Sequence, residues 1–437
     1  MTAGDNDVVI AGTGIAGAVA ACELRRRGFA VWMLEPARTY GARGIEALPA
    51  ATVAAFHDLG LGACLVRAAA VAVRGFENAW EGVSQPRVLD GIWHHVERHA
   101  LARALRDAAL ERGAHVLRVE RLPPLVPGDG GGPFRWEVAG LPPVSRFSVD
   151  ATGRAARWSR PVIRGGDQIA TLFRGPGAPR PRRGRIVRTT AGWAYALFHP
   201  AATTVGVVTT APRIAPRGTL STEVADALEL ASPEAFQLER RCAAYPQWAA
   251  SPSSTLPARG RFAVGDAALA YEPIAGQGVR FALASAVAAA ACCATQRDVG
   301  GAGTGDFQAA AQYFEEFVGS ARRRHLAQLD AREGDASDTP APVVAEDVAL
   351  RFAAEIAPTG LRQDSQIVAG VGIRLTNGEL VRWLGRFDLL DLHELAGEPR
   401  AARELHVMLQ ERGVPRTHAE ALVQWCVRHG VLSPIGP

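Results

Sequence analysis

The segment at residues 7–35 constrains the fold of this chain more than any other stretch. It begins with VVIAGTGIAG at residues 8–17, continues through helix-forming residues to Gly28, and ends in the apolar run 30–34 followed by Glu35. This pattern predicts a buried strand, a tight glycine turn, a helix that ends at glycine, and a second strand. The chain is therefore expected to start with a parallel βαβ unit.

Each glycine of this turn has a physical purpose in binding a dinucleotide. Gly12 permits the tight turn, Gly14 lets a diphosphate approach the backbone, and Gly17 lets the helix pack close to the strand. Ala16 completes the turn beside them. Glu35 can accept hydrogen bonds from a ribose 2′-OH, which favours FAD or NAD over NADP.

A second motif, RFAVGDAALAYEPIAGQGVRFALASA at residues 261–286, distinguishes between these two cofactors. Gly265 and Asp266 end a predicted strand, and the Asp can accept hydrogen bonds from the sugar-alcohol chain of a flavin. Gly276 and Gly278 allow the backbone to lie against a flat ring, and the helix that follows directs its N-terminus toward that ring. A helix N-terminus stabilises the negative charge of a reduced flavin, whereas NAD has no comparable need.

These motifs resemble those of the class A flavoprotein monooxygenases and their relatives, the FAD-dependent halogenases, over roughly the first three quarters of the chain. The resemblance implies FAD as cofactor and implies cofactor contacts from Arg43 and Arg98, in the segments RGIE at 43–46 and WHHVERHALARALRDAALERGAHV at 93–116. DATGRAARWSR at 150–160 is similar to the family segment that closes the dinucleotide domain. Leu269 departs from the histidine that many of these hydroxylases carry.

The resulting fold class is α/β: a Rossmann-like FAD-binding domain with an inserted β-sheet substrate domain, plus a small mainly helical C-terminal domain. The FAD-binding domain is assigned to residues 1–160 and 255–330, and the substrate domain to 161–254, where period-two patterns predict strands. A polar, Pro-rich linker is expected at 331–343 and the helical domain at 344–437. Apolar residues recur at helical spacing in four segments, which predicts helices at 345–357, 379–395, 399–413 and 416–430.

The chain contains no lysine, because its 48 basic residues are all arginine. GWAYALF at 192–198 resembles a degraded halogenase signature, but halogenases need a lysine amine to capture hypohalous acid, and a guanidinium is a poor nucleophile. The resemblance therefore implies a monooxygenase that hydroxylates an aromatic ring through a C4a-hydroperoxyflavin. Trp193 and Tyr195 are the candidate substrate contacts, although aromatic residues on a sheet also serve simple packing.

Glu272, Pro273 and His199 are the catalytic candidates. Pro273 also belongs to the cofactor loop, and either Glu272 or His199 could take a proton from an indole or phenol. Glu272 also fits a loop acid paired with arginine, and His199 a residue at a strand end. We expect no metal site.

Partners follow from composition and from the resemblance. We expect an aromatic substrate, O2, and NAD(P)H or a separate reductase as electron donor, because VAGVGI at 368–373 leads into a turn and is no second dinucleotide motif. The net charge of +4 and mixed local charges predict no nucleic acid, and no run is apolar enough to predict a membrane span, so a cytoplasmic location is expected.

The arrangement also resembles the flavoprotein monooxygenases that mature quinohemoprotein amine dehydrogenase. This resemblance implies a tryptophan side chain in a peptide or small protein subunit as substrate, oxidised toward a tryptophylquinone. Two alternatives stay open: a small-molecule hydroxylase or halogenase-like tailoring enzyme of secondary metabolism, and a non-catalytic flavin-binding partner protein.

Overall fold

The computed structural model describes most of the chain. The described residues are 7–37, 44–79, 87–128, 133–180, 182–190, 192–210, 219–253, 260–273, 276–298, 304–333, 344–363, 366–384 and 387–435. They form two units, Met1–Cys293 and Ala294–Pro437. The division falls inside helix α6 (Gly278–Asp298), so residues 294–330 group with the C-terminal part rather than with the FAD-binding domain to which the sequence assigned them.

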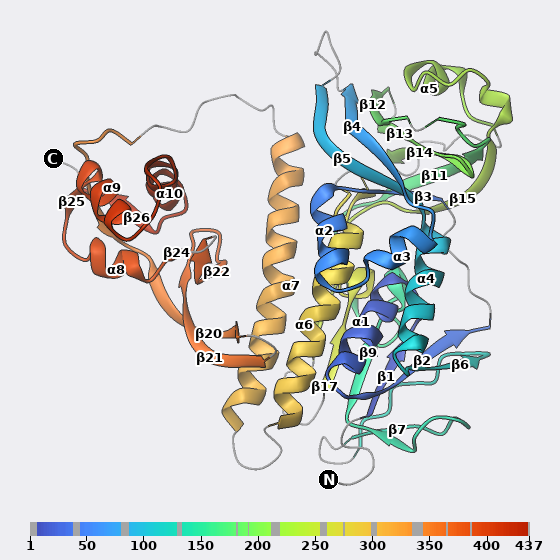
Figure 1. Ribbon diagram of the computed structural model, residues 1–437, viewed down its shortest axis with the longest axis horizontal. Helices are drawn as coiled ribbons and strands as arrows, with labels where there is room; N and C mark the ends of the chain where they lie inside the picture. Colours follow the sequence, from blue (N-terminus) through green and yellow to red (C-terminus); the bar gives the residue numbers. More distant parts are fainter. Residues whose placement is uncertain are drawn as a thin grey trace. The chain divides into compact units, whose positions relative to one another are not determined.

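A parallel five-stranded sheet carries the first motif. Its strands, in spatial order, are β17 (Gly260–Ala263), β9 (Phe147–Asp150), β1 (Asp7–Ala11), β2 (Ala30–Pro36) and β6 (His115–Val119). The side chains of Val8, Val9 and Ile10 are fully buried, as expected for a central strand with both faces covered. Helix α1 (Ile15–Arg26) packs against α4 (Arg98–Glu111) beside this sheet (Figure 1). The predicted Rossmann-like core is confirmed.

An eight-stranded mixed sheet forms the second layer of the first unit, where β4 and β5 stand out as two long neighbouring strands (Figure 1). Its strands, in spatial order, are β15 (Gln237–Ala243), β11 (Gln168–Gly175), β14 (Ala202–Thr210), β13 (Gly192–His199), β12 (Gly184–Thr189), β4 (Val71–Ala79), β5 (Arg87–Glu97) and β3 (Ile45–Leu48). The strands predicted within 162–210 are therefore present. β5 occupies the start of the 93–116 segment, so its helix begins only at Arg98.

Smaller elements complete the first unit. They are α2 (Ala50–Asp58), α3 (Gly62–Arg67), α5 (Thr222–Ala227), the paired strands β7 (Phe134–Arg135) and β8 (Val144–Ser145), and a three-stranded sheet of β10 (Val162–Arg164), β16 (Gln247–Ala249) and β18 (Leu269–Ala270). Short 3-10 turns lie at Gly153–Ala155, Pro233–Ala235 and Gly265–Ala267. Helix α6 is long and apolar enough to cross a membrane by length and composition, but 78% of that stretch is buried within the protein, as in a core helix.

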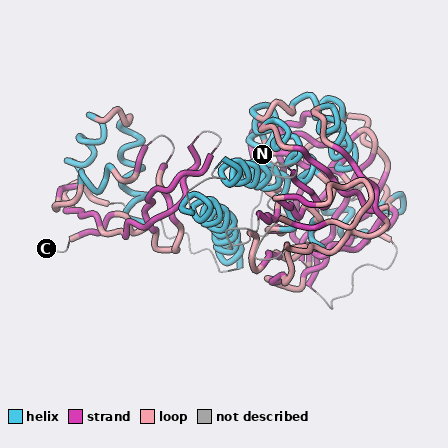
Figure 2. Tube along the Cα trace, turned by 90° about the horizontal axis from the view of Figure 1, so that it is seen from below, coloured by secondary structure: helices cyan, strands magenta, loops and turns pink. Residues whose placement is uncertain are grey.

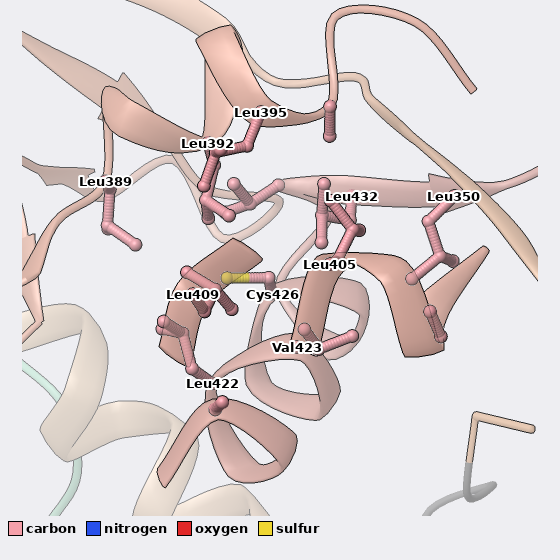
Figure 3. Packing of buried hydrophobic residues seen from close by; sticks show 14 of the residues in the cluster. Leu350, Leu389, Leu392, Leu395, Leu405, Leu409, Leu422, Val423, Cys426 and Leu432 are labelled. Carbon is pink, nitrogen blue, oxygen red and sulfur yellow. The ribbon is translucent and has the colours of Figure 1, made fainter. Parts of the chain in front are cut away.

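The second unit contains strands as well as helices (Figure 2). Helix α7 (Thr304–Glu333) contacts the hairpin of β20 (Glu355–Gln363) and β21 (Gln366–Arg374), and β22 (Leu380–Val381) extends that sheet. The remaining elements are β19 (Ala349–Phe352), β23 (Trp383–Leu384), β24 (Phe387–Asp388), α8 (Asp391–Leu395), β25 (Arg400–Ala401), α9 (Ala402–Glu411), α10 (Arg416–Arg428) and β26 (Leu432–Pro434). Leu405, Leu409, Val423 and Cys426 are fully buried between α9 and α10 (Figure 3).

Two helix predictions in this region are wrong. Residues 345–357 contain β19 and the start of β20, and residues 379–395 contain three short strands before α8. The alternating burial along β19, where Leu350 is buried and Arg351 is exposed, fits a strand paired with β26. The helices predicted at 399–413 and 416–430 are present as α9 and α10.

Candidate functional site

The glycine turn after β1 leaves space for a ligand and none for extra side chains. Gly12 has φ +107°, and a Cβ atom there would lie 2.5 Å from the Ala151 carbonyl oxygen. A Cβ atom on Gly17 would lie 2.1 Å from the carbonyl oxygen of Gly12. Around Gly14, the N-cap of α1, no atom lies within 4 Å of such a Cβ position. The open side of the turn therefore faces the helix N-terminus, where a diphosphate would bind.

Glu35 lies near the end of β2, next to the end of β1, and three hydrogen-bond donors hold its side chain in place. Its carboxylate accepts hydrogen bonds from Thr13 Oγ1 at 3.0 Å, Arg106 Nη1 at 3.0 Å and Arg118 Nε at 3.3 Å. The residue is 7% exposed, so these contacts fix the carboxylate at the rim of the turn. This position suits a ribose hydroxyl, as the sequence predicts.

A cavity of about 1230 Å³ opens beside the turn and contains Gly12, Gly14 and Glu35. Six arginines contribute to its lining, namely Arg98, Arg103, Arg106, Arg121, Arg157 and Arg160. A concentration of guanidinium groups favours a polyanionic ligand such as a diphosphate. Arg98 and Gly153 also line two further cavities, so the three spaces meet at these residues.

Arg98 connects the two predicted motifs. Its guanidinium donates to Glu46 Oε1 at 2.7 Å and lies 4.0 Å from Asp266 Oδ2. The negative charge of Glu46 raises the pKa of Arg98, which stays protonated. Arg98 and Asp266 therefore lie beside each other in the lining of two of these cavities, while Arg43 lies outside the described residues.

The GD motif is a turn that packs on the first motif. Gly265 has φ +57°, its N–H donates to Ser285 Oγ at 2.9 Å, and a Cβ atom on it would lie 2.7 Å from Cβ of Ala16. Gly276 also has φ +57°, and no atom lies within 4 Å of a Cβ position on Gly278 at the start of α6. Ala16 acts through this packing, whereas Gly278 faces open space.

The third cavity, of about 600 Å³, lies between the 272–278 loop and the eight-stranded sheet. The aromatic residues Phe76, Trp93, Trp193 and Tyr195 line its sheet side, and Glu272, Pro273, Gly276 and Gly278 line its loop side. Its volume is in the usual range for a small-molecule or cofactor site.

Two predicted substrate contacts lie together on the sheet wall of this cavity. The rings of Trp193 and Tyr195 have centroids 5.8 Å apart and are tilted by 33°. The Tyr195 ring covers Gly206 on the neighbouring strand, where a Cβ atom would lie 2.2 Å from the ring. Burial raises the pKa of the Tyr195 hydroxyl well above its usual value, so Tyr195 is neutral and can donate a hydrogen bond.

The structure separates the three catalytic candidates. Glu272 is 6% exposed and lines the 600 Å³ cavity together with Pro273. His199 is absent from the described lining of that cavity. Its Nε2 lies 2.9 Å from the Ala69 carbonyl oxygen, and its Nδ1 accepts from the Ala201 N–H at 3.2 Å, so both ring nitrogens hold the end of β13 in place.

Several residues that line the 600 Å³ cavity were not singled out from the sequence, among them Trp93, Arg154, Arg240 and Cys242. Arg154 donates to the carbonyl oxygens of Tyr245 at 2.8 Å and Tyr271 at 3.0 Å. Arg154 belongs to the segment that follows Asp150, which was a recognisable signal. Arg240 and Cys242 lie on an edge strand with no local motif, so only the strand pairing places them here.

The described residues fit an FAD molecule. The glycine turn leaves room for a diphosphate, the Glu35 carboxylate at the next strand end could accept from a ribose hydroxyl, and the cavities join at Arg98. Residues 12, 14, 35, 98, 266, 276 and 278 would contact the cofactor, and residues 16, 17 and 265 keep its binding turn closely packed.

Comparisons with known proteins agree with this fit. Residues 5–127 match the FAD binding domain family. No curated protein matches the chain. The solved structure of the peptidyl tryptophan dihydroxylase QhpG, essential for tryptophylquinone cofactor biogenesis, is similar over 97% of this chain and 99% of that one, with 21% identity and a TM-score of 0.68.

Two further structures share the fold. CmlS, a flavin-dependent halogenase, covers 98% of this chain and 96% of its own, with 16% identity and a TM-score of 0.72. PqsL, a probable FAD-dependent monooxygenase from Pseudomonas aeruginosa, covers 76% and 96%, with 20% identity and a TM-score of 0.58. The matched residues show that the chain contains an FAD binding domain, and its fold is the one that these flavin-dependent halogenases and monooxygenases share.

Proposed function

We propose that the chain is a monooxygenase that hydroxylates an aromatic ring, and that its substrate is a tryptophan side chain within a peptide or small protein subunit. The observation that carries the proposal is the 600 Å³ cavity, whose aromatic wall faces the 272–278 loop and which joins the nucleotide cavity at Arg98. When bound and reduced, FAD supplies an activated form of molecular oxygen.

The residues of this chain bind and orient the substrate in this account. Trp193 and Tyr195 stack against its ring, because tilted aromatic pairs add attraction beyond area burial. Glu272 takes the proton that the indole or phenol loses, and Pro273 fixes the backbone beside it. His199 is left out of this role, since its nitrogens are engaged at the end of β13.

The absence of lysine favours oxygen transfer over halogenation, because an arginine guanidinium cannot supply the nucleophilic amine. The peptide substrate is suggested by the similarity to QhpG over nearly the whole of both chains. A small-molecule aromatic substrate is the second candidate, favoured by the similarity to CmlS over an equal share of the chain.

The electron donor is NAD(P)H or a separate reductase in this proposal. VAGVGI at 368–373 lies within strand β21 and leads into a turn, so it does not form a second dinucleotide motif. The tryptophylquinone pathway as the biological setting and the cytoplasmic location both stay predictions.

The test is product analysis with matched substrates. The FAD-loaded protein, a reductant and oxygen are incubated with one of four compounds at a time. These are a tryptophan peptide, the same peptide with phenylalanine in place of tryptophan, free indole, and free phenol. The product masses are measured by mass spectrometry. The account expects the tryptophan peptide to gain one or two oxygen atoms. Oxygen gain by free indole or phenol alone would contradict the peptide substrate, and no gain with any compound would contradict the monooxygenase.

A further inference from the structure

We propose that Arg240 binds a carboxylate carried by the substrate, so that the site selects aromatic compounds with an acidic group beside the ring. This inference rests on the proposed function in one respect, since it takes the 600 Å³ cavity as the substrate site. It adds a specificity residue and a chemical class of substrate.

The register of the sheet brings Arg240 into the aromatic wall. Arg240 on β15 pairs with Leu172, Leu172 pairs with Gly206, and Gly206 pairs with Tyr195. The next row contains Cys242, Ala170, Val208 and Trp193 in the same order of strands. Since paired strands lie about 4.8 Å apart, Arg240 and Tyr195 stand roughly 14 Å apart along one row.

The Tyr195 and Arg240 side chains lie closer together than the backbones of their strands. Gly206 has no side chain, so the Tyr195 ring lies over it toward β11 and β15. Arg240 comes close enough that its charge opposes the rise that burial causes in the pKa of Tyr195. A ring stacked on Trp193 and Tyr195 would therefore have a guanidinium at one end.

Arg240 also lacks a partner that would occupy it. Among the described residues it makes no hydrogen bond or ion pair, and its Nε atom is buried without an acceptor. The two other arginines that line the cavity are engaged: Arg98 with Glu46, and Arg154 with two carbonyl oxygens. A guanidinium with unmet donors matches a carboxylate, which it can bind with two parallel hydrogen bonds.

The acids of the cavity oppose the reverse orientation. Asp266 and Glu272 lie on the segment that contains the cofactor loop, and Glu46 is already paired with Arg98, whereas Arg240 lies on β15. A substrate carboxylate near the loop would meet these like charges. The favoured pose therefore places the acid at Arg240 and the ring between the aromatic wall and the loop.

Binding of two matched probes to the oxidised holoenzyme tests the inference. Indole-3-propionate and indole-3-propionamide share their ring and chain, and differ only in the charged group. Calorimetric titration is expected to show that the wild type binds the carboxylate at least tenfold more tightly, the usual effect of a hydrogen bond to a charged group. Arg240→Gln is expected to abolish the preference for the carboxylate over the amide, and Arg240→Lys to retain part of it.

Equal binding of both probes by the wild type would overturn the proposal, as would an unchanged preference in Arg240→Gln. Arg241→Gln serves as the matched control, because Arg241 is the next residue of β15, faces the opposite side of the sheet and is not part of the cavity lining. It is expected to keep the wild-type preference. If Arg240→Gln does not fold, the ratio of the two Kd values in the wild type and the preference of Arg240→Lys still decide the test.

Two capped peptides, tryptophan-glutamate and tryptophan-glutamine, identify the source of the carboxylate. An Arg240-dependent preference for the glutamate peptide supports an acidic residue beside the target tryptophan, and a preference confined to indole-3-propionate supports a small aromatic acid. Oxygen incorporation is measured in parallel. A carboxylate preference without any oxygenated product would support this inference and contradict the proposed function.

Discussion

Arg98 donates a 2.7 Å hydrogen bond to Glu46 and lies 4.0 Å from Asp266, which joins strand β3, helix α4 and the GD turn at one point. The three cavities of the first unit described above meet at this arginine. Arg98 thus lies between the cavity beside the glycine turn and the cavity beside Glu272 and Pro273.

Replacing Arg98 is expected to weaken FAD binding. Arg98→Gln removes a charge-assisted contact and leaves Glu46 without its partner, so the Kd for FAD should rise by at least tenfold. Fluorescence titration of the apoprotein with FAD measures this change. Arg67→Gln removes an exposed ion pair with Glu111 and should leave the Kd unchanged, whereas equal effects of the two variants would contradict the role of Arg98.

Gly14→Ala separates cofactor binding from folding. Gly14 has φ −69° and ψ −176°, which alanine adopts readily, and no atom lies within 4 Å of the new Cβ. The variant should keep the melting temperature of the apoprotein and lose FAD affinity, because the methyl group enters the diphosphate space. Gly17→Ala is the contrast, since its Cβ would lie 2.1 Å from the Gly12 carbonyl oxygen and should lower the melting temperature itself. Unimpaired FAD binding by Gly14→Ala would contradict the placement of the diphosphate.

Acid is expected to destabilise the first unit through His95. Burial lowers the pKa of this fully buried histidine to about 4, and its Nδ1 lies 2.8 Å from the Phe198 carbonyl oxygen. Below the unfolded pKa of about 6.5 the unfolded chain binds the proton first, so stability falls as pH falls from 6.5 toward 4. The loss between pH 7 and pH 5 should be about 2 kcal/mol.

Urea unfolding at these two pH values measures that loss, and His95→Gln removes the titrating group. The variant should be less sensitive to the change in pH than the wild type, whatever its stability at pH 7. An equal loss in both proteins would assign the acid sensitivity to other groups.

Truncating the core of the C-terminal helices is expected to leave FAD binding intact. Leu405 is fully buried in the cluster of Figure 3, so Leu405→Ala should cost about 2–5 kcal/mol. The residues that line the three cavities all belong to the first unit. Thermal unfolding should therefore show a lowered transition while the FAD titration stays as in the wild type. A parallel loss of FAD would show that the cofactor site depends on the second unit.

The sequence was most informative where function depends on local backbone shape. Gly12, Gly17 and Gly265 could be recognised because their roles depend on positive φ or on close backbone packing, which leave a pattern of neighbouring residues. Asp150 also has a local role. Its carboxylate accepts hydrogen bonds from the backbone N–H groups of Thr152 and Trp158, which lie only a few residues further along the chain.

Features that depend on distant pairing could not be predicted in this way. Residues 345–357 have helical spacing, but β19 and β20 form because each pairs with a strand far along the chain or beyond a turn. Arg240 lies in the substrate cavity only because β15 pairs with β11. His199 lies outside the described lining of that cavity, and its Nε2 contacts the Ala69 carbonyl oxygen instead. The residues next to Arg240 and His199 in the sequence predict neither the strand pairing nor the contact with Ala69.

The central claim is that a flavin beside the 272–278 loop oxygenates an aromatic ring in the 600 Å³ cavity, and isotope labelling tests it most directly. The FAD-loaded protein is reduced without air, mixed with a tryptophan peptide, and exposed to either ordinary or ¹⁸O-labelled molecular oxygen before mass spectrometry of the peptide. The account predicts a product that carries one or two oxygen atoms taken from the labelled gas. A product without the label, or an unmodified peptide beside a protein that does not take up FAD, would contradict it.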